Sequence, residues 1–194
     1  YFYYVTSIFV DPETESDPSS IVSGIRGSIA GVQNQEWDDG SAEYGGYWGS
    51  DEGYAMRFTS GESFSQITGA KVYIVNFFGD PTSPFEVRVY NSGQGLLQSG
   101  IYAAASEGDQ WVEIDLTPYN IIADGPDFYI GVFFPDNEDG LKPGLGMDAS
   151  GAFYDRSWEF SWWSGNIIMT QGGLNYMIRA TYTNSATPHS LHAQ

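Results

Sequence analysis

The stretch Phe85-Glu-Val-Arg-Val-Tyr90 decides the fold class, because apolar and polar side chains alternate along most of it. Successive side chains of a β-strand point to opposite faces, so the alternation predicts a strand with Phe85, Val87 and Val89 facing a core. The stretch Tyr54-Ala-Met-Arg-Phe-Thr59 alternates in a similar way. Both stretches predict strands with one buried face.

Further apolar runs of strand length recur at short intervals from Glu36 onward, separated by turn signals such as Gly79-Asp80-Pro81. This spacing is typical of an all-β sandwich or jelly roll. The predicted fold class is a jelly-roll-type antiparallel β-sandwich with an added N-terminal strand and almost no helix. The other predicted strands are Ala70–Phe78, Trp111–Leu116, Phe128–Phe134 and Tyr176–Tyr182, with one or two more in Ile21–Gln33.

The first ten residues, Tyr1-Phe-Tyr-Tyr-Val-Thr-Ser-Ile-Phe-Val10, form an uncharged β-type run with two apolar faces. Such a strand needs cover on both sides, since an exposed one invites aggregation. We therefore predict that it is buried and paired in a sheet, with most of that burial against a neighbouring subunit. The alternative is an ordinary first strand paired within its own chain. The predicted subunit-interface residues are Tyr1, Phe2, Tyr3, Tyr4, Val5, Ile8, Phe9 and Val10.

An acidic connector, Asp11–Ser20, follows this strand and cannot contribute to a core. The predicted organisation is residues 1–35 as N-terminal strand, connector and lead-in strand, residues 36–183 as the β-sandwich domain, and residues 184–194 as a C-terminal tail. The chain starts without Met and without a signal sequence, as expected of a processed mature protein or an excised domain.

Seven basic and 25 acidic residues give a net charge of −18. This charge argues against nucleic-acid and anionic-membrane partners, and it suits cations, above all calcium. Acidity also keeps proteins in solution, which is the commoner reason for it. The chain has no cysteine, which excludes disulfides and thiolate chemistry. No apolar run reaches the roughly 18 residues that a membrane-spanning helix needs.

Several blocks resemble a family of secreted bacterial and archaeal β-sandwich modules. These modules open with an aromatic-Asp-Asp-Gly-x-x-Glu signature, matched by Trp37–Glu43, and close with a Met-Ile-Arg-Ala strand, matched by Met177–Ala180. The resemblance covers residues 36–183. It implies a non-catalytic, extracellular or cell-surface accessory module, commonly appended to peptidases and other surface proteins.

Catalytic residues are not predicted. The two histidines, His189 and His192, lie in the C-terminal tail, and without a cysteine the usual activated nucleophiles and bases are missing. Acidic pairs could hydrolyse glycosides, but with 25 acidic residues some pair will always look suitable. We therefore expect a protein that is not an enzyme.

The best metal candidates are Asp38, Asp39 and Glu43, because a turn with several carboxylates can supply the oxygen ligands that calcium prefers. The alternative is a plain glycine-assisted turn at Asp39-Gly40. The best small-ligand candidates are Trp158, Phe160, Trp162 and Trp163, whose rings could stack on sugars. Their alternative role is core packing.

Two functions are compatible with these features. The first is a self-assembling subunit of a filament or surface polymer, a homopolymer in which the terminal donor strand of one copy completes a sheet of the next. The second is a carbohydrate-binding or adhesive accessory module of a larger secreted protein, with surface polysaccharide as its partner. Deletion of residues 1–12 would discriminate between them, because only the first function requires the terminal strand.

Overall fold

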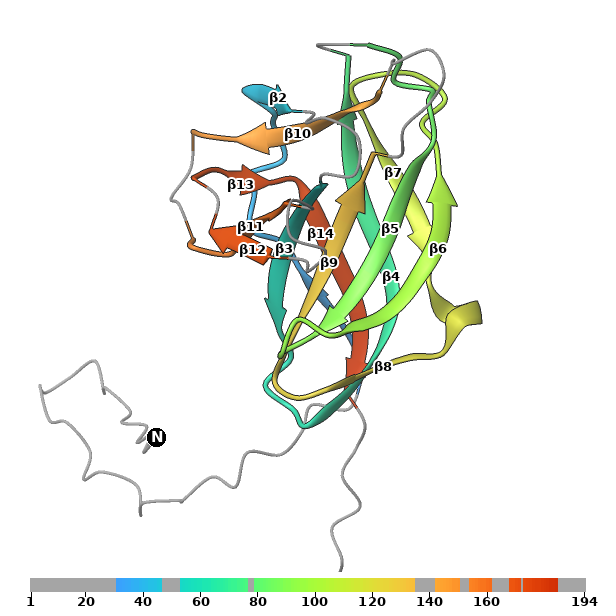
Figure 1. Cartoon of the computed structure of the whole chain (residues 1–194), viewed down its shortest axis with the longest axis vertical. Helices are drawn as coiled ribbons and strands as arrows, with labels where there is room; N and C mark the ends of the chain where they lie inside the picture. The colour runs from blue at the N-terminus through green and yellow to red at the C-terminus, as the bar shows by residue number, and fades with distance from the viewer. Residues whose placement is uncertain are drawn as a thin grey trace, which may run out of the picture.

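The computed structural model describes residues 31–46, 53–76, 79–134, 142–150, 154–161, 168–171 and 173–184. These residues form two antiparallel β-sheets, and the short 3-10 turn η1 (Thr117–Tyr119) is the only helical element among them (Figure 1). No helix in these ranges is long and apolar enough to cross a membrane. The two-sheet, all-β fold that the alternating strands predict is confirmed. Its jelly-roll connectivity remains a prediction.

The first sheet has six strands in the order β12-β11-β3-β9-β5-β6. The predicted strands around Tyr54–Thr59 and Phe85–Tyr90 are both present in it, and Phe85, Val87 and Val89 are completely buried, as expected. The strands are β12 (Ile168–Gln171), β11 (Ser157–Ser161), β3 (Gly53–Thr59), β9 (Asp127–Phe133), β5 (Phe85–Asn91) and β6 (Leu96–Ala103).

The second sheet has eight strands arranged around β4 (Phe64–Val75), the longest strand of the described chain. One side of β4 pairs first with β8 (Ile121–Asp124) and then with β7 (Gln110–Asp115). Its other side pairs with β14 (Ile178–Asn184) and then with β10 (Gly144–Asp148). The remaining strands are β1 (Gly31–Gln35), which pairs with β14, and β13 (Asn175–Tyr176) and β2 (Tyr44–Gly46), which pair with β10.

The predicted strand Tyr176–Tyr182 is divided between two partners. Its first residue ends β13, which pairs with β10, whereas β14 begins at Ile178 and pairs with β4. Met177 lies between them, and its N–H donates to Gly146 while its carbonyl accepts from Tyr73. The Met-Ile-Arg-Ala motif therefore lies where the chain passes from one strand pair to another.

The core between the sheets consists of aliphatic and aromatic side chains from both inner faces. Burial of large apolar side chains supplies most of the stabilisation of such a sandwich, at about 1.5–3 kcal/mol for each fully buried residue. The largest include Tyr54, which meets Tyr176 edge to face at a ring distance of 4.8 Å, and Phe58, which stacks on Phe128 at 5.5 Å.

A second apolar cluster lies on the outer face of the six-stranded sheet. It consists of the alternate residues of β3, β5, β9 and β11, those that point away from the main core. At the base of this cluster lie two small residues, Ala55 and Gly131, which pair across adjacent strands. The buried members are Ala55, Tyr90, Tyr129, Phe133 and Phe160, with Trp158 packed against them. This sheet is therefore apolar on both faces.

Candidate functional site

The predicted acidic turn lies between β1 and β2 and is anchored to β10. The N–H of Glu43 donates to the carbonyl of Met147 at 3.1 Å, and Tyr44 pairs with Met147 in the β2–β10 ladder. Gly40 has φ 94°, in the left-handed region that glycine tolerates best, as the predicted turn requires. Because β10 ends at Asp148, this anchoring brings the turn beside a carboxylate more than a hundred residues further along the chain.

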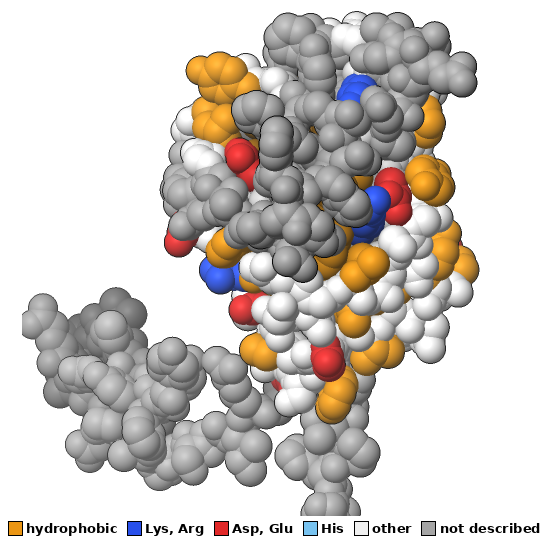
Figure 2. Space-filling view, viewed as in Figure 1, with side chains coloured by type: hydrophobic (Ala, Val, Ile, Leu, Met, Phe, Trp, Pro, Cys, Tyr) orange, Lys and Arg blue, Asp and Glu red, His pale blue; other side chains and the backbone are white. Residues whose placement is uncertain are grey.

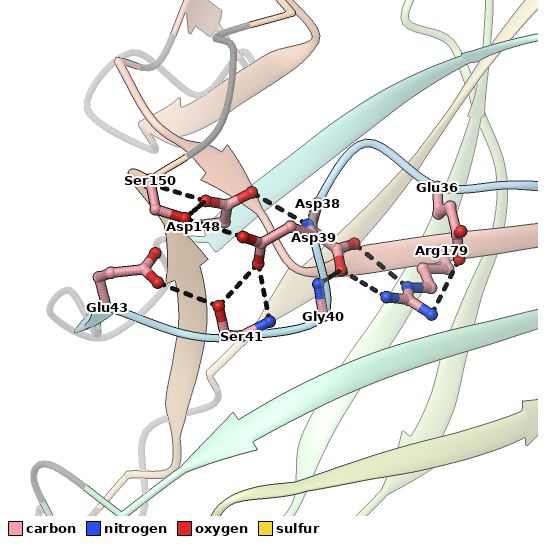
Figure 3. A network of polar contacts seen from close by, with 9 residues as sticks. All are labelled: Glu36, Asp38, Asp39, Gly40, Ser41, Glu43, Asp148, Ser150 and Arg179. Carbon is pink, nitrogen blue, oxygen red and sulfur yellow. Dashed lines mark hydrogen bonds and ion pairs between the residues drawn. The ribbon is translucent and has the colours of Figure 1, made fainter.

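Asp38 and Asp39 are adjacent in sequence but form hydrogen bonds with different groups (Figure 3). The Asp38 carboxylate receives hydrogen bonds from Arg179 and from the N–H of Gly40. The Asp39 carboxylate instead receives the N–H and the hydroxyl of Ser41, at 2.9 and 2.7 Å, and the hydroxyl of Ser150 at 2.9 Å. The predicted metal residue Asp38 is thus placed in an ion pair, whereas Asp39 faces the end of β10.

Asp39, Glu43 and Asp148 form an oxygen cluster, in which one carboxylate oxygen of each residue lies within 4.8 Å of the others. Asp148 is only 2% exposed, while Asp39 and Glu43 lie at the surface. Asp148 accepts hydrogen bonds from the N–H groups of Asp39, at 3.1 Å, and Ser150, at 2.9 Å. The cluster therefore joins the turn to the end of β10 through a buried carboxylate.

Hydrogen bonds favour the charged form of Asp39 and hold Glu43 in place. The N–H and hydroxyl of Ser41, together with the hydroxyl of Ser150, lower the pKa of Asp39 below its ordinary value. Glu43 accepts from the hydroxyl of Ser41 at 3.1 Å and from the N–H of Ala149 at 2.9 Å. The nearby cation of this network, Arg179, is directed at Asp38 and at Glu36.

This chemistry fits a hard divalent cation. Calcium takes roughly six to eight oxygen ligands, and three carboxylates with the hydroxyls of Ser41 and Ser150 offer a large part of such a shell. The same oxygens also form a turn stabilised by side-chain hydrogen bonds to the backbone, which needs no ion. Both roles remain compatible with the geometry.

The sequence predicted two of the three clustered carboxylates, Asp39 and Glu43, but not the third, Asp148. The available signal was the run Gly144-Leu-Gly-Met-Asp148 followed by Ala149-Ser150, an Asp-x-Ser turn at the end of a glycine-rich strand. Two glycines make this strand hard to identify, because glycine is rare inside strands. Here a Cβ on Gly146 would lie 2.8 Å from the ring of Tyr73, so the glycine permits close packing.

Two of the four aromatic candidates, Trp158 and Phe160, lie among the described residues. Phe160 is 3% exposed and lies between Tyr90 and Phe133, at ring distances of 5.1 and 4.8 Å. Trp158 is partly buried and meets Tyr129 edge to face. These two rings take part in packing on the outer sheet face. Trp162, Trp163 and the whole predicted interface strand Tyr1–Val10 lie outside the described residues, as do His189 and His192.

The comparisons with known proteins bear on the fold. No family model matches the chain, and no curated protein matches it. One similar solved structure is the clostridial cysteine protease Cwp84 after propeptide cleavage: 12% identity, TM-score 0.55, covering 89% of this chain and 42% of that one. Another contains the cysteine protease and lectin-like domains of Cwp84, a surface layer associated protein of Clostridium difficile: 14% identity, TM-score 0.47, covering 69% of this chain and 32% of that one.

The chain thus spans less than half the length of each of these structures. At 12% identity, the likeness to the propeptide-cleaved protease establishes a shared fold. The described molecule is an antiparallel β-sandwich that carries an oxygen cluster at the junction of its first turn and β10.

Proposed function

We propose that this protein is a non-enzymatic, calcium-binding structural module of the extracellular surface. The observation that carries the proposal is the convergence of Asp39, Glu43 and Asp148 from two distant segments onto one oxygen cluster. A cation there would join the turn to β10 without any further chemistry. The fold shared with a clostridial protease, itself described as surface layer associated, supports the location.

The proposal predicts that calcium stabilises the full chain. Because an ion that binds the folded state adds free energy by linkage, calcium at about a hundredfold above its Kd adds about 2.7 kcal/mol. For a chain of this size, that stabilisation raises the Tm by about 5–10 °C. Scanning calorimetry with calcium and with a chelator measures the shift directly.

Two variants make the calcium test specific. Glu43→Gln removes the charge of an exposed cluster member and should abolish most of the calcium-dependent shift. Glu113→Gln removes an exposed charge from the ion pair that Glu113 forms with Lys71, outside the cluster, and should keep the shift. A melting curve that is the same with calcium and with chelator would leave the hydrogen-bonded turn as the role of this cluster.

We further propose that the biological form is a homopolymer assembled by strand addition through Tyr1–Val10. The support is physical: the segment is uncharged and apolar on both faces, so an aqueous surface cannot accommodate it alone. Phe2→Asp with Ile8→Asp places charges on one of those faces and should abolish assembly, as seen by electron microscopy and light scattering. The matched control, Ser19→Asp with Ser20→Asp in the connector, adds the same charge and should still assemble.

The circular-dichroism melting curve of the double variant distinguishes the two places that the strand could occupy. If the strand pairs with another copy, the Phe2→Asp, Ile8→Asp chain should remain folded as a monomer. If that chain unfolds completely, the strand belongs to its own sandwich and assembly by strand addition is wrong.

A carbohydrate-binding or adhesive accessory module is the second candidate function. Its support is the aromatic density from Trp158 to Trp163, although Phe160 and Trp158 take part in packing. Binding to surface polysaccharide that is lost in Trp162→Ala with Trp163→Ala, with assembly intact, would favour this function. Polysaccharide binding that survives both substitutions would remove its support.

A further inference from the structure

The edges of the two sheets differ in how well they are protected against pairing with another strand. β1 and β12 are short, and β8 has only four residues and carries Asp124. β7 carries Glu113 and Asp115. Charges and short length are the usual devices that prevent edge-to-edge pairing. Among the described edge strands, these four are therefore poor acceptors for an incoming strand.

β6 lacks these protective features. It runs for eight residues from Leu96 to Ala103, contains neither charge nor proline, and pairs with β5 alone among the described strands. Its register against β5 shifts at two places, which bends the strand but leaves its outer edge uncharged. β6 is thus the longest edge of the described sandwich that carries neither charge nor proline.

The exposed side chains of β6 are apolar. Leu96 is 52% and Tyr102 64% exposed, and Figure 2 shows hydrophobic side chains along the side of the molecule where Figure 1 places β6. On a chain with a net charge of −18, two copies repel each other over most of their surfaces. A contact between copies therefore requires two uncharged surfaces, and β6 provides one.

We infer that β6 is the acceptor edge for residues Tyr1–Val10 of a second copy of this chain. The inference rests on the proposed assembly by strand addition and names its acceptor. The incoming segment has ten uncharged residues for an edge of eight, so main-chain hydrogen bonds can form on either side of the irregularity at Gly100. Its aromatic residues then pack beside Leu96 and Tyr102, in the cross-strand positions where such pairs stabilise a sheet.

The position of β1 is compatible with an acceptor in another molecule. β1 forms one edge of the eight-stranded sheet, whereas β6 belongs to the other sheet and packs near β8, on the far side of β4. The twenty residues 11–30 reach at most roughly 70 Å when extended. This reach allows the strand to extend to a neighbour, and each copy then offers its own β6 to the next, which yields a fibre.

Disulfide trapping tests this inference directly, because the natural chain has no cysteine. Full-length Val5→Cys, labelled with nitrogen-15, is mixed with unlabelled Tyr102→Cys or Leu96→Cys and oxidised, and heterodimers are identified by mass. The matched control replaces the acceptor with Tyr119→Cys, an exposed tyrosine outside β6. We expect at least tenfold more heterodimer with either β6 position than with Tyr119→Cys.

A double variant, Val5→Cys with Tyr102→Cys in one chain, distinguishes a donor strand of a second copy from a donor strand of the same chain. Linkage that grows with protein concentration supports a second copy, while linkage within single chains at every concentration overturns the inference. Equal heterodimer yields at β6 and at Tyr119 also overturn it. Natural filaments without β6 linkage would leave assembly standing and remove β6 as the acceptor, whereas a chain that never assembles removes both.

A lysine on the edge provides an independent measurement. Tyr102→Lys adds the residue that most often protects natural edges, and Glu86 lies opposite it in β5, so the fold tolerates the charge. Filament formation should fall at least tenfold while the Tm stays unchanged. Tyr119→Lys makes the same charge change elsewhere and should assemble normally. Assembly of both variants to the same extent would overturn the inference.

Discussion

The Asp38 carboxylate is completely buried beneath the guanidinium of Arg179, which donates to it from Nη2 at 2.6 Å and from Nε at 3.2 Å. The same guanidinium contacts Glu36 at 2.9 Å and lies 4.2 Å above the ring of Trp111. The two carboxylates raise the pKa of Arg179 above its ordinary value, chiefly through the hydrogen bond to Asp38. Two motifs that sequence reasoning placed at opposite ends of the module, Asp-Asp-Gly and Met-Ile-Arg-Ala, are thus joined by one ion pair.

Removal of the Asp38 charge should therefore destabilise the fold. Asp38→Asn leaves the guanidinium without its buried partner, and loss of one member of a buried pair costs about 3–5 kcal/mol. Because Arg179 is partly exposed and keeps Glu36 and Trp111, we expect about 2–3 kcal/mol in urea unfolding. Glu36→Gln, on the exposed side of the same guanidinium, should cost less than about 1 kcal/mol. Equal losses in the two variants would contradict this account.

Acid should destabilise the protein partly through Glu86. Burial raises the pKa of this carboxyl, but the hydrogen bonds from Arg88 and from the N–H of Gly100 outweigh burial and hold the pKa below its ordinary value of 4.5. A lowered pKa contributes stability that is present above pH 4.5 and is lost as the pH falls through the folded-state pKa.

Glu86→Gln isolates that contribution. In urea unfolding, the variant should be less stable than the natural chain near neutral pH, and the difference should shrink as the pH falls below 4.5. The stability of the variant should itself still fall as the pH falls, because hydrogen bonds also lower the pKa values of Asp39, Asp80 and Asp115. A stability difference that stays constant across this pH range would exclude a role for Glu86 ionisation.

Two glycines with the same backbone angle provide a matched pair of substitutions. Gly79 and Gly100 both have φ 75°, but a Cβ on Gly79 would collide with the main chain of Lys142, whereas a Cβ on Gly100 meets nothing within 4 Å. Gly100→Ala should therefore cost only the left-handed strain, about 1–2 kcal/mol. Gly79→Ala adds the collision and should cost more than about 3 kcal/mol. Chemical unfolding of both variants measures the difference, and equal costs would contradict it.

The alternating strands β3 and β5 could be predicted from the sequence, because every second residue in most of each strand is apolar and points into the main core. β6 and β10 could not, since Gly100 in one and Gly144 and Gly146 in the other resemble turn signals. At Gly146 the reason is packing against Tyr73, and at Gly100 it is a positive φ within the irregular β5–β6 pairing. Local composition does not reveal these tertiary demands.

The candidate site could likewise be predicted only in part from the sequence. Asp39 and Glu43 belong to one turn, so their proximity could be predicted, but the pairing of Asp38 with Arg179 and the approach of Asp148 depend on strand order. Nothing in a single sequence indicates that β2 lies beside β10. The sequence therefore predicted acidic residues suited to calcium, and the fold determined which of them converge.

The last prediction concerns Phe160 and separates packing from ligand binding on the outer face of the six-stranded sheet. Its ring contacts Tyr90 and Phe133 and approaches Gly131, where a Cβ would lie 3.2 Å from Phe160. Phe160→Ala empties this space, and such large-to-small changes in a packed cluster cost about 3–5 kcal/mol. Tyr119→Ala, at an exposed tyrosine, should cost less than about 1 kcal/mol in the same urea titration. If Phe160→Ala instead keeps full stability and loses affinity for polysaccharide, the ring of Phe160 contacts a ligand. That result would favour the carbohydrate-binding function over a packing role.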